Sequence, residues 1–114
     1  MLSIILALLF VAHPGPCQAG MEAEIDHLLG YIESADCTFD RNGTLYDSRE
    51  AAAHIRKKYA HTQRWIKSTT DFIRYAATES SISGRPYLVI CNGVTTPTAA
   101  WLADELARFR ENAQ

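Results

Sequence analysis

The chain has 114 residues, of which 11 are Lys or Arg and 13 are Asp or Glu, giving a formal net charge of −2 at pH 7. This length suits one domain with a single modest core and leaves little room for a second. A slightly acidic chain lacks the strongly basic surface that nucleic-acid binding requires, so we expect no nucleic-acid partner.

Residues 1–19 have the features of a secretory signal peptide. Residues 1–12 are uncharged and largely apolar, but they are too few for a stable membrane span of about 20 residues. Cys17 and Ala19 are small residues three and one positions before a possible cut, as an A-x-A-like site requires. We therefore expect cleavage between Ala19 and Gly20, no membrane span afterwards, and a periplasmic or secreted protein.

Two alternatives to simple cleavage are a lipoprotein anchored at Cys17 and a leader that is retained as a membrane anchor. The lipoprotein hypothesis is disfavoured because Gly15 and Pro16, rather than aliphatic residues, precede the cysteine. Cleavage would leave a single mature domain, residues 20–114.

The mature chain would contain two cysteines, Cys37 and Cys91. An even pair in an exported protein indicates a disulfide, and a loop of this length predicts a stabilisation of about 4 kcal/mol in the chain-entropy model. Two free thiols are the alternative. A redox-active pair is disfavoured because no C-x-x-C spacing is present.

A first helix is predicted over Met21–Ala35. Its apolar residues have the i, i+3, i+4, i+7 spacing of one buried helix face: Ile25, Leu28, Leu29 and Ile32. Six acidic residues and no Lys or Arg lie between Gly20 and Asp40. We interpret these acids as a solvated face, because nothing beside them would tune a carboxyl for acid–base catalysis.

A β-hairpin is predicted next, with strands Thr38–Arg41 and Thr44–Tyr46 around Asn42-Gly43. Asn-Gly readily supplies the two positive φ angles of a type I′ turn. Phe39, together with Leu45 or Tyr46, is expected to be buried.

The second helix is predicted from a capping box at Asp47 and Glu50 to about Ser68, with Ser48 as a rival cap. Its expected apolar stripe is Ala52, Ile55, Tyr59 and Ile66. The opposite side carries the candidate contacts for an anion or a partner: His54, Lys57, His61 and Arg64.

Two interpretations of this basic helix remain open. In the first, it is a solvated face or packs beside the acidic first helix; in the second, it is a surface that binds lipid phosphate, acidic polysaccharide or a partner protein. A metal site is disfavoured, because His54 and His61 would be about 10 Å apart along a helix and metal–ligand bonds are about 2 Å long. Only convergence with a distant ligand such as His27 would restore a metal site.

A short helix is expected from Thr69 to about Thr78, followed by a serine-rich connector over residues 80–86. This connector lacks the glycines and lysine of a phosphate-binding loop, but it is the first place to look for a bound ligand. The apolar run Tyr87–Cys91 predicts a buried third strand, and pairing with the first hairpin strand would bring Cys91 close to Cys37. After Asn92-Gly93, a last helix is predicted over about Thr98–Glu111.

The segments EIDHLLGYIESADCTF, RNGTLYDSREAA, HIRKKY, DFIRYAATESSISGRPYLVIC and AAWLADELARFR together resemble the small exported bacterial proteins grouped as domain of unknown function 5329. The resemblance covers nearly the whole mature chain and includes both Cys37 and Cys91. It implies Gram-negative export, most often to the periplasm. It implies no reaction and carries no catalytic residue over to this chain.

The predicted fold class is α+β: a small three-stranded sheet, made of the hairpin and one later strand, packed with three to four helices and held by one disulfide. The predicted function is a non-enzymatic binding or envelope-associated module that contacts an envelope component or a partner protein. No catalytic, cofactor or metal residue is predicted, and the oligomeric state is left open. The alternative is a small periplasmic hydrolase or transferase, whose site would join His27, His54 or His61 with an Asp or with Ser80–Ser83.

Overall fold

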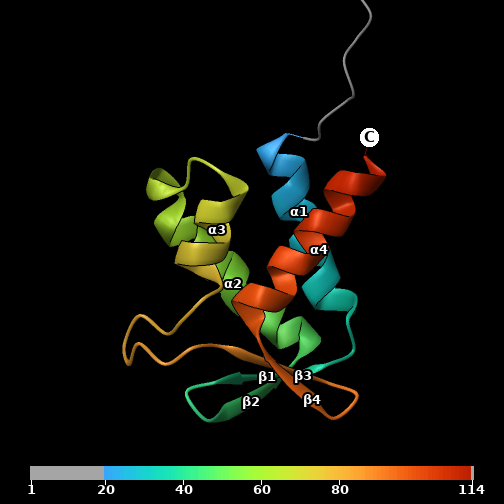
Figure 1. Ribbon diagram of the computed structural model, residues 1–114. Coiled ribbons are helices and arrows are strands. Elements are labelled where there is room, and N and C mark those ends of the chain that lie inside the picture. The colour runs from blue at the N-terminus through green and yellow to red at the C-terminus, as the bar shows by residue number, and fades with distance from the viewer. Residues whose placement is uncertain (1–19, 114) are drawn as a thin grey trace, which may run out of the picture.

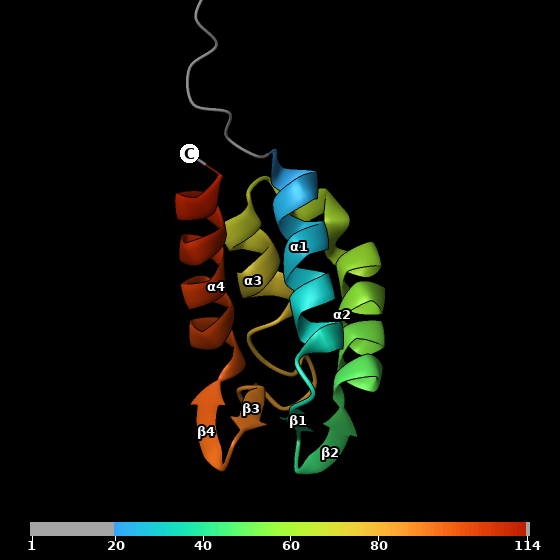
Figure 2. The ribbon, with the colours of Figure 1, turned by 90° about the vertical axis from the view of Figure 1, so that its right-hand side faces the viewer.

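The computed structural model describes residues 20–113, so the predicted leader, residues 1–19, lies outside the described residues. Four helices gather over a small sheet, which lies at the end of the molecule opposite the two ends of the described chain (Figures 1 and 2). In chain order the elements are α1 (Met21–Ser34), β1 (Thr38–Arg41), β2 (Thr44–Asp47), α2 (Ser48–Thr62), η1 (Gln63–Trp65), α3 (Thr69–Ala76), β3 (Leu88–Cys91), β4 (Val94–Pro97) and α4 (Thr98–Asn112).

The sheet has four strands in the order β2-β1-β3-β4, and every neighbouring pair is antiparallel. The α+β class is therefore confirmed, but the expected three-stranded sheet is wrong by one strand. The missed strand is β4, which pairs antiparallel with β3. The pairing begins with Leu88 opposite Pro97 and ends with Cys91 opposite Val94. It is a short edge strand of mostly exposed residues ending in proline, so its sequence shows little of the apolar alternation that predicts a strand.

Helix α2 begins as its capping residues predict and ends earlier than its apolar stripe predicts. The Asp47 carboxylate accepts a hydrogen bond from the Glu50 amide at 2.8 Å, and the Glu50 side chain accepts one from the Asp47 amide. The helix ends at Thr62, whose hydroxyl donates to the Lys58 carbonyl at 2.8 Å. Ile66 is still buried, but it is reached through the 3-10 turn η1 and not along the helix.

The core lies between the helices and the inner face of the sheet. Its buried residues include the four apolar positions of α1 and Phe39 of β1, as predicted. In β2 it is Tyr46 that lies against the protein, whereas Leu45 is 61% exposed, because successive strand residues face opposite sides of a sheet.

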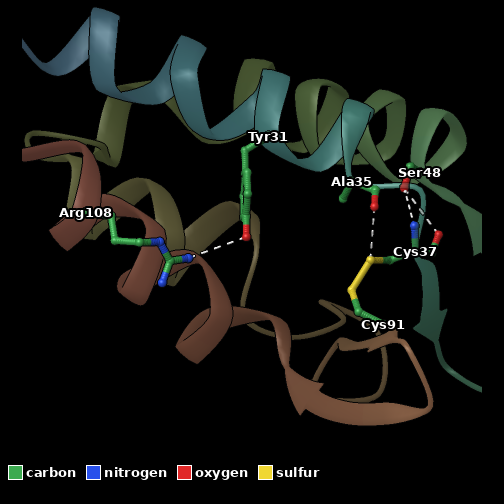
Figure 3. Close-up of a disulfide and its surroundings, with 6 residues drawn as sticks. All are labelled: Tyr31, Ala35, Cys37, Ser48, Cys91 and Arg108. Atoms are coloured by element: carbon green, nitrogen blue, oxygen red, sulfur yellow. Dashed lines mark hydrogen bonds between the residues drawn. A yellow bond between two sulfur atoms is a disulfide. The ribbon is translucent and has the colours of Figure 1, made fainter. Parts of the chain in front are cut away.

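The predicted disulfide joins Cys37 and Cys91, whose Cα atoms are 4.9 Å apart (Figure 3). The Ser48 hydroxyl accepts a hydrogen bond from the Cys37 amide at 3.0 Å and donates one to the Cys37 carbonyl at 3.2 Å. The Cys37 Sγ lies 3.3 Å from the Ala35 carbonyl oxygen; a disulfide sulfur carries no proton, so this is a contact rather than a hydrogen bond. The disulfide thus fixes the end of α1 and the start of α2 to the centre of the sheet.

The fold contains an internal two-fold repeat that the sequence-based prediction missed. Helix, hairpin and helix occur twice, as α1-β1-β2-α2 and as α3-β3-β4-α4. Asn42-Gly43 and Asn92-Gly93 are 50 residues apart, and all four have positive φ. In the central β1–β3 pair Phe39 lies opposite Val89, its own counterpart, so the pseudo-two-fold axis passes through this pair.

The two halves differ most where α1 and α3 end. The cap Gly20 makes no side-chain hydrogen bond, whereas the Ser68 hydroxyl accepts one from the Asp71 amide. Helix α1 has 14 residues and α3 has 8. The last turns of α1 therefore have no helical counterpart in the second half. Their place is taken by residues 77–87, a loop that leaves α3 and swings out on the side of the β1–β2 hairpin (Figure 1).

Candidate functional site

A cavity of about 410 Å³ lies between α2, the inner face of the β1–β2 hairpin and the loop 77–87. This volume is within the range of small-molecule sites, about 300–1,000 Å³. Helix α2 lines it along one stripe, from Ala51 to Thr62. The opposite walls come from the sheet, the end of α3 and the loop residues Ser81 and Ile82.

The cavity gathers three of the four candidate contact residues. His54, Lys57 and His61 line it, whereas Arg64 does not. Arg64 lies in η1, beyond the end of α2, and its guanidinium stacks over the Trp65 ring at 4.2 Å from the centroid. His54 packs edge-on against Tyr46, with ring centroids 4.6 Å apart. Three of the candidate contacts, together with Ile55 of the apolar stripe, thus contribute to one wall of a cavity.

The cavity carries unneutralised positive charge. Arg41, Lys57 and Lys58 line it, and within residues 20–113 none of them forms an ion pair with a carboxylate. The lining carboxylate, Asp40, accepts a hydrogen bond from the Gly43 amide at 2.8 Å and is thereby held at the hairpin turn. In the described part of the chain, the ion pair between the acidic first helix and α2 joins Arg56 and Glu33 at 2.8 Å.

The loop 77–87 is fastened to both sides of the cavity. The Asn42 side-chain amide donates to the Ser80 hydroxyl at 2.8 Å, and the Ser83 hydroxyl donates to the Asn42 side-chain carbonyl. On the other side, the Lys58 ammonium donates to the Glu79 carbonyl at 2.5 Å. The hairpin turn and helix α2 therefore hold the loop over the cavity.

Thr98, the first residue of α4, also lines the cavity. Its side chain is fully buried, yet its hydroxyl has no hydrogen-bond partner within residues 20–113. Its counterpart in the other half is Ser48, whose buried hydroxyl makes two hydrogen bonds to Cys37. An unpaired buried hydroxyl is costly, so Thr98 carries a cost that Ser48 does not.

Comparison of the two halves explains why a cavity forms only on this side. Ala51 of α2 corresponds to Trp101 of α4, 50 residues later. The Trp101 ring packs on Tyr31 at 4.5 Å and against Phe39 at 5.7 Å between centroids. A large ring thus fills the space beside α4, whereas a methyl group and a loop leave space open beside α2.

The cavity also brings together residue types that the alternative hydrolase would need. His54, His61, Asp40 and Ser81 all line it. Nucleophile activation requires a histidine within hydrogen-bond reach of the serine, and within residues 20–113 neither histidine bonds a serine or an aspartate. Nothing in this arrangement therefore favours the hydrolase over a binding site.

His27 lies apart from the cavity, in the contact between α1 and α4. Its Nε2 is 2.9 Å from the Glu105 carboxylate, and its ring stacks on Phe109 at 4.0 Å between centroids. Hydrogen bonds from His27 and Arg108 lower the pKa of Glu105, although burial, the largest single effect, opposes them. Across residues 20–113, no group of three His, Cys, Asp or Glu side chains is arranged to hold a metal ion.

A second charged cluster ties α1 to α3 and α4. The Glu24 side chain, in a residue only 6% exposed, accepts hydrogen bonds from Arg110 at 2.7 and 3.1 Å and from the Thr69 hydroxyl at 2.6 Å. The hydrogen bond from Arg110 holds the pKa of Glu24 below its usual value, with help from Thr69 and against the effect of burial. All the acceptor oxygens are occupied, so this cluster stabilises the fold and is not a free site.

Three cavity residues were not predicted as site residues from the sequence: Arg41, Lys58 and Thr98. The repeated Asn-Gly turn could have revealed Thr98, since it places Thr98 at the position of Ser48 and marks a second helix start. Arg41 and Lys58 could have been found only with the position of the loop, which has no counterpart in the first half. In the part of the chain described, residues 20–113, no helix has the length and apolar character needed to cross a membrane.

Comparison with known proteins identifies relatives but no activity. The model of a family of unknown function, DUF5329, matches residues 19–110. A similar protein is the uncharacterized protein YfeK of Salmonella typhimurium strain LT2, which is 39% identical over 67 residues. That alignment spans 58% of this chain and 56% of the relative, so the chain matches only about half of that protein. No solved structure matches the chain.

Proposed function

Because the chain belongs to the family of unknown function DUF5329, which supplies no reaction, we propose a function from the site itself: this is an exported, non-enzymatic protein that binds an anionic component of the cell envelope. The binding site is the cavity beside α2. The observation that carries the proposal is the gathering of Arg41, Lys57 and Lys58 around one cavity without ion pairs among the described residues.

The charge arrangement favours an anionic ligand over a solvated face. A solvated face spreads all its cations into water, whereas here Arg41 and Lys58 are half-buried in a concave surface beside the exposed Lys57, and low-dielectric walls strengthen the attraction of half-buried cations for an anion. The histidines His54 and His61 add hydrogen-bonding groups to the same walls.

Two features support export. The leader-like residues 1–19 precede the described domain, and the Cys37–Cys91 disulfide joins the two central strands. Disulfides of this structural kind persist in oxidising compartments such as the periplasm. Export predicts a mature protein that begins at Gly20, with an intact mass two protons lower than that of the reduced chain.

The test compares two charge reversals that change the net charge of the protein by the same amount. Lys57→Glu reverses a charge inside the cavity, and Arg64→Glu reverses one outside it. Mature protein is mixed with vesicles containing phosphatidylglycerol and separated by flotation. We expect wild type and Arg64→Glu to float with the vesicles and Lys57→Glu to lose most of the bound fraction.

Three outcomes would count against the proposal. Equal losses in both variants would indicate a diffuse basic surface instead of a cavity site. Binding to neutral vesicles as strong as to anionic ones would remove the role of charge. A mature protein recovered only in the cytoplasm would refute export.

A further inference from the structure

We infer that anion binding in this cavity is coupled to proton uptake by His54 and His61, so that binding tightens as the pH falls. This inference concerns the regulation of the proposed site and rests on the proposed function. It follows from the positions of the two histidines on α2 and from the charged groups that face them.

The two histidines flank a pair of lysines on one side of α2. His54 precedes Lys57 by three residues and Lys58 by four, and His61 follows the same lysines by four and three residues. Residues at these spacings are neighbours on a helix surface, with Cβ atoms about 5–6 Å apart. All four residues line the cavity, so an anion held by Lys57 has an imidazole one helical turn away on either side.

Neither cavity histidine is committed to another polar group. Within residues 20–113, His54 and His61 form no ion pair and no side-chain hydrogen bond. The half-buried His54 packs edge-on against the Tyr46 ring, and His61 is exposed. His27 differs, because its Nε2 lies 2.9 Å from the Glu105 carboxylate. The ring nitrogens of the cavity histidines can therefore take up a proton and donate hydrogen bonds to an anion.

The carboxylates nearest to the two histidines are held by backbone amides. Glu50 lies one turn before His54, and its side chain accepts a hydrogen bond from the Asp47 amide at 3.4 Å. Across the cavity, Asp40 accepts one from the Gly43 amide at 2.8 Å. The acidic residues of α1 do not line the cavity, and α3 contributes only Ala76 to it. In the described part of the chain a protonated cavity histidine thus lacks a carboxylate partner, and a bound anion would supply the missing negative charge.

The other titratable groups around the histidines are cationic or neutral at pH 7. Arg41, Lys57 and Lys58 line the cavity together with two tyrosines, and Arg64 lies one turn beyond His61. A proton on either imidazole would add to this positive charge, and an anion in the cavity favours that addition. Proton uptake and anion binding therefore favour each other reciprocally. Because a histidine ordinarily gains its charge between pH 8 and pH 5, the affinity for an anion should rise over that range as the pH falls.

The first measurement is flotation with phosphatidylglycerol vesicles, the probe of the proposed function, at about pH 8 and about pH 5.5. The phosphodiester of this lipid keeps its single negative charge at both values, so a change in affinity reports on the protein. Wild type should bind about tenfold more tightly at the lower pH, because each charged histidine beside the anion contributes up to about fivefold in affinity.

Four variants locate the effect. His54→Gln and His61→Gln should each reduce the pH effect to about threefold, and the double variant should bind equally at both pH values. His27→Gln is the matched control, because it removes one titratable imidazole outside the cavity, and it should keep the tenfold effect. His61→Lys places a fixed charge at an exposed position. It should bind about threefold more tightly than wild type at about pH 8, a gain that a misfolded variant could not show.

The second measurement counts protons directly. Calorimetric titration of the protein with the vesicles, in two buffers of different ionisation heat, gives the number of protons taken up on binding. Wild type and His27→Gln should take up protons near pH 6.5, and the double variant should take up almost none.

The contrary outcomes separate the inference from the proposed function. If wild type binds equally at both pH values and binding still depends on Lys57, the proton coupling is refuted and the proposed function stands. If the double variant keeps the pH effect or the proton uptake of wild type, or if His27→Gln loses as much as His54→Gln, the coupling at the cavity is likewise refuted. If the protein binds the vesicles at neither pH, the inference and the proposed function both fail.

Discussion

Replacing Thr98 by valine should make the ligand-free protein more stable. The Thr98 side chain is fully buried and its hydroxyl has no partner within residues 20–113, so the folded state carries a desolvation cost of about 1–3 kcal/mol that the unfolded chain does not. Valine keeps the β-branched shape and exchanges this hydroxyl for a methyl group. We expect a gain of about 1–2 kcal/mol.

The gain should be visible in both chemical and thermal unfolding. For a domain of this size, 1 kcal/mol corresponds to about 4–8 °C in the melting temperature, so a shift of about 5–10 °C is expected. The assay is urea unfolding of the lipid-free, oxidised protein, followed by tryptophan fluorescence. The denaturant slope should not change, because the surface exposed on unfolding is nearly the same.

Ser48→Ala is the comparison at the equivalent position. The Ser48 hydroxyl bonds both the amide and the carbonyl of Cys37, so its removal should destabilise the protein by about 1–3 kcal/mol. The two hydroxyl deletions should thus have opposite signs. If Thr98→Val also destabilises the protein, the hydroxyl has a bonding partner in the free protein, and its assignment as an unpaired buried group is refuted.

Two further predictions concern the α1–α4 contact and the loop. Because the pKa of Glu24 is lowered in the folded state, its contribution to stability is present above the unfolded pKa of about 4.3 and is lost as the pH falls below that value. Glu24→Gln should therefore show a smaller loss of unfolding free energy on acidification than wild type, and an equal loss would contradict the assignment. Asn42→Gly, which keeps the positive-φ turn but removes the bonds to Ser80 and Ser83, should speed hydrogen exchange in residues 79–85. Asn92→Gly should not, since Asn92 makes no side-chain hydrogen bond among the described residues, and equal exchange in both variants would show that Asn42 does not hold the loop.

Much of the fold could be predicted because its signals are local. The apolar spacing of α1, the Asp47–Glu50 capping box and the Asn42-Gly43 turn each depend on residues a few positions apart. The disulfide was predicted from an even pair of cysteines in an exported chain, and it required Tyr87–Cys91 to pair with the first hairpin strand. That pairing is present, between β1 and β3.

The errors come from features that no local pattern encodes. Helix α2 ends at Thr62, and a separate helix, α3, begins after the N-cap Ser68. No Gly or Pro between them marks the end of α2 in the sequence. The strand β4 is defined by pairing with β3 rather than by its own sequence. A helical wheel puts His54, Lys57 and His61 on one side of a helix, but it cannot show that a loop some 20 residues later lies across a cavity from them.

The two-fold repeat gives the molecule its own internal reference. Every backbone position of β1-β2-α2 has a counterpart 50 residues later in β3-β4-α4. Each residue can therefore be compared with the one at the equivalent position of the other half. Those differences are concentrated in one place: alanine in place of tryptophan, an unwound helix end, a cation in place of a cysteine, and a threonine without the bonds of its serine twin. One of the two equivalent places is closed by the Cys37–Cys91 disulfide and filled by the Trp101 ring, while the other holds the cavity. A chain of this size can therefore carry an open cavity without a separate supporting domain.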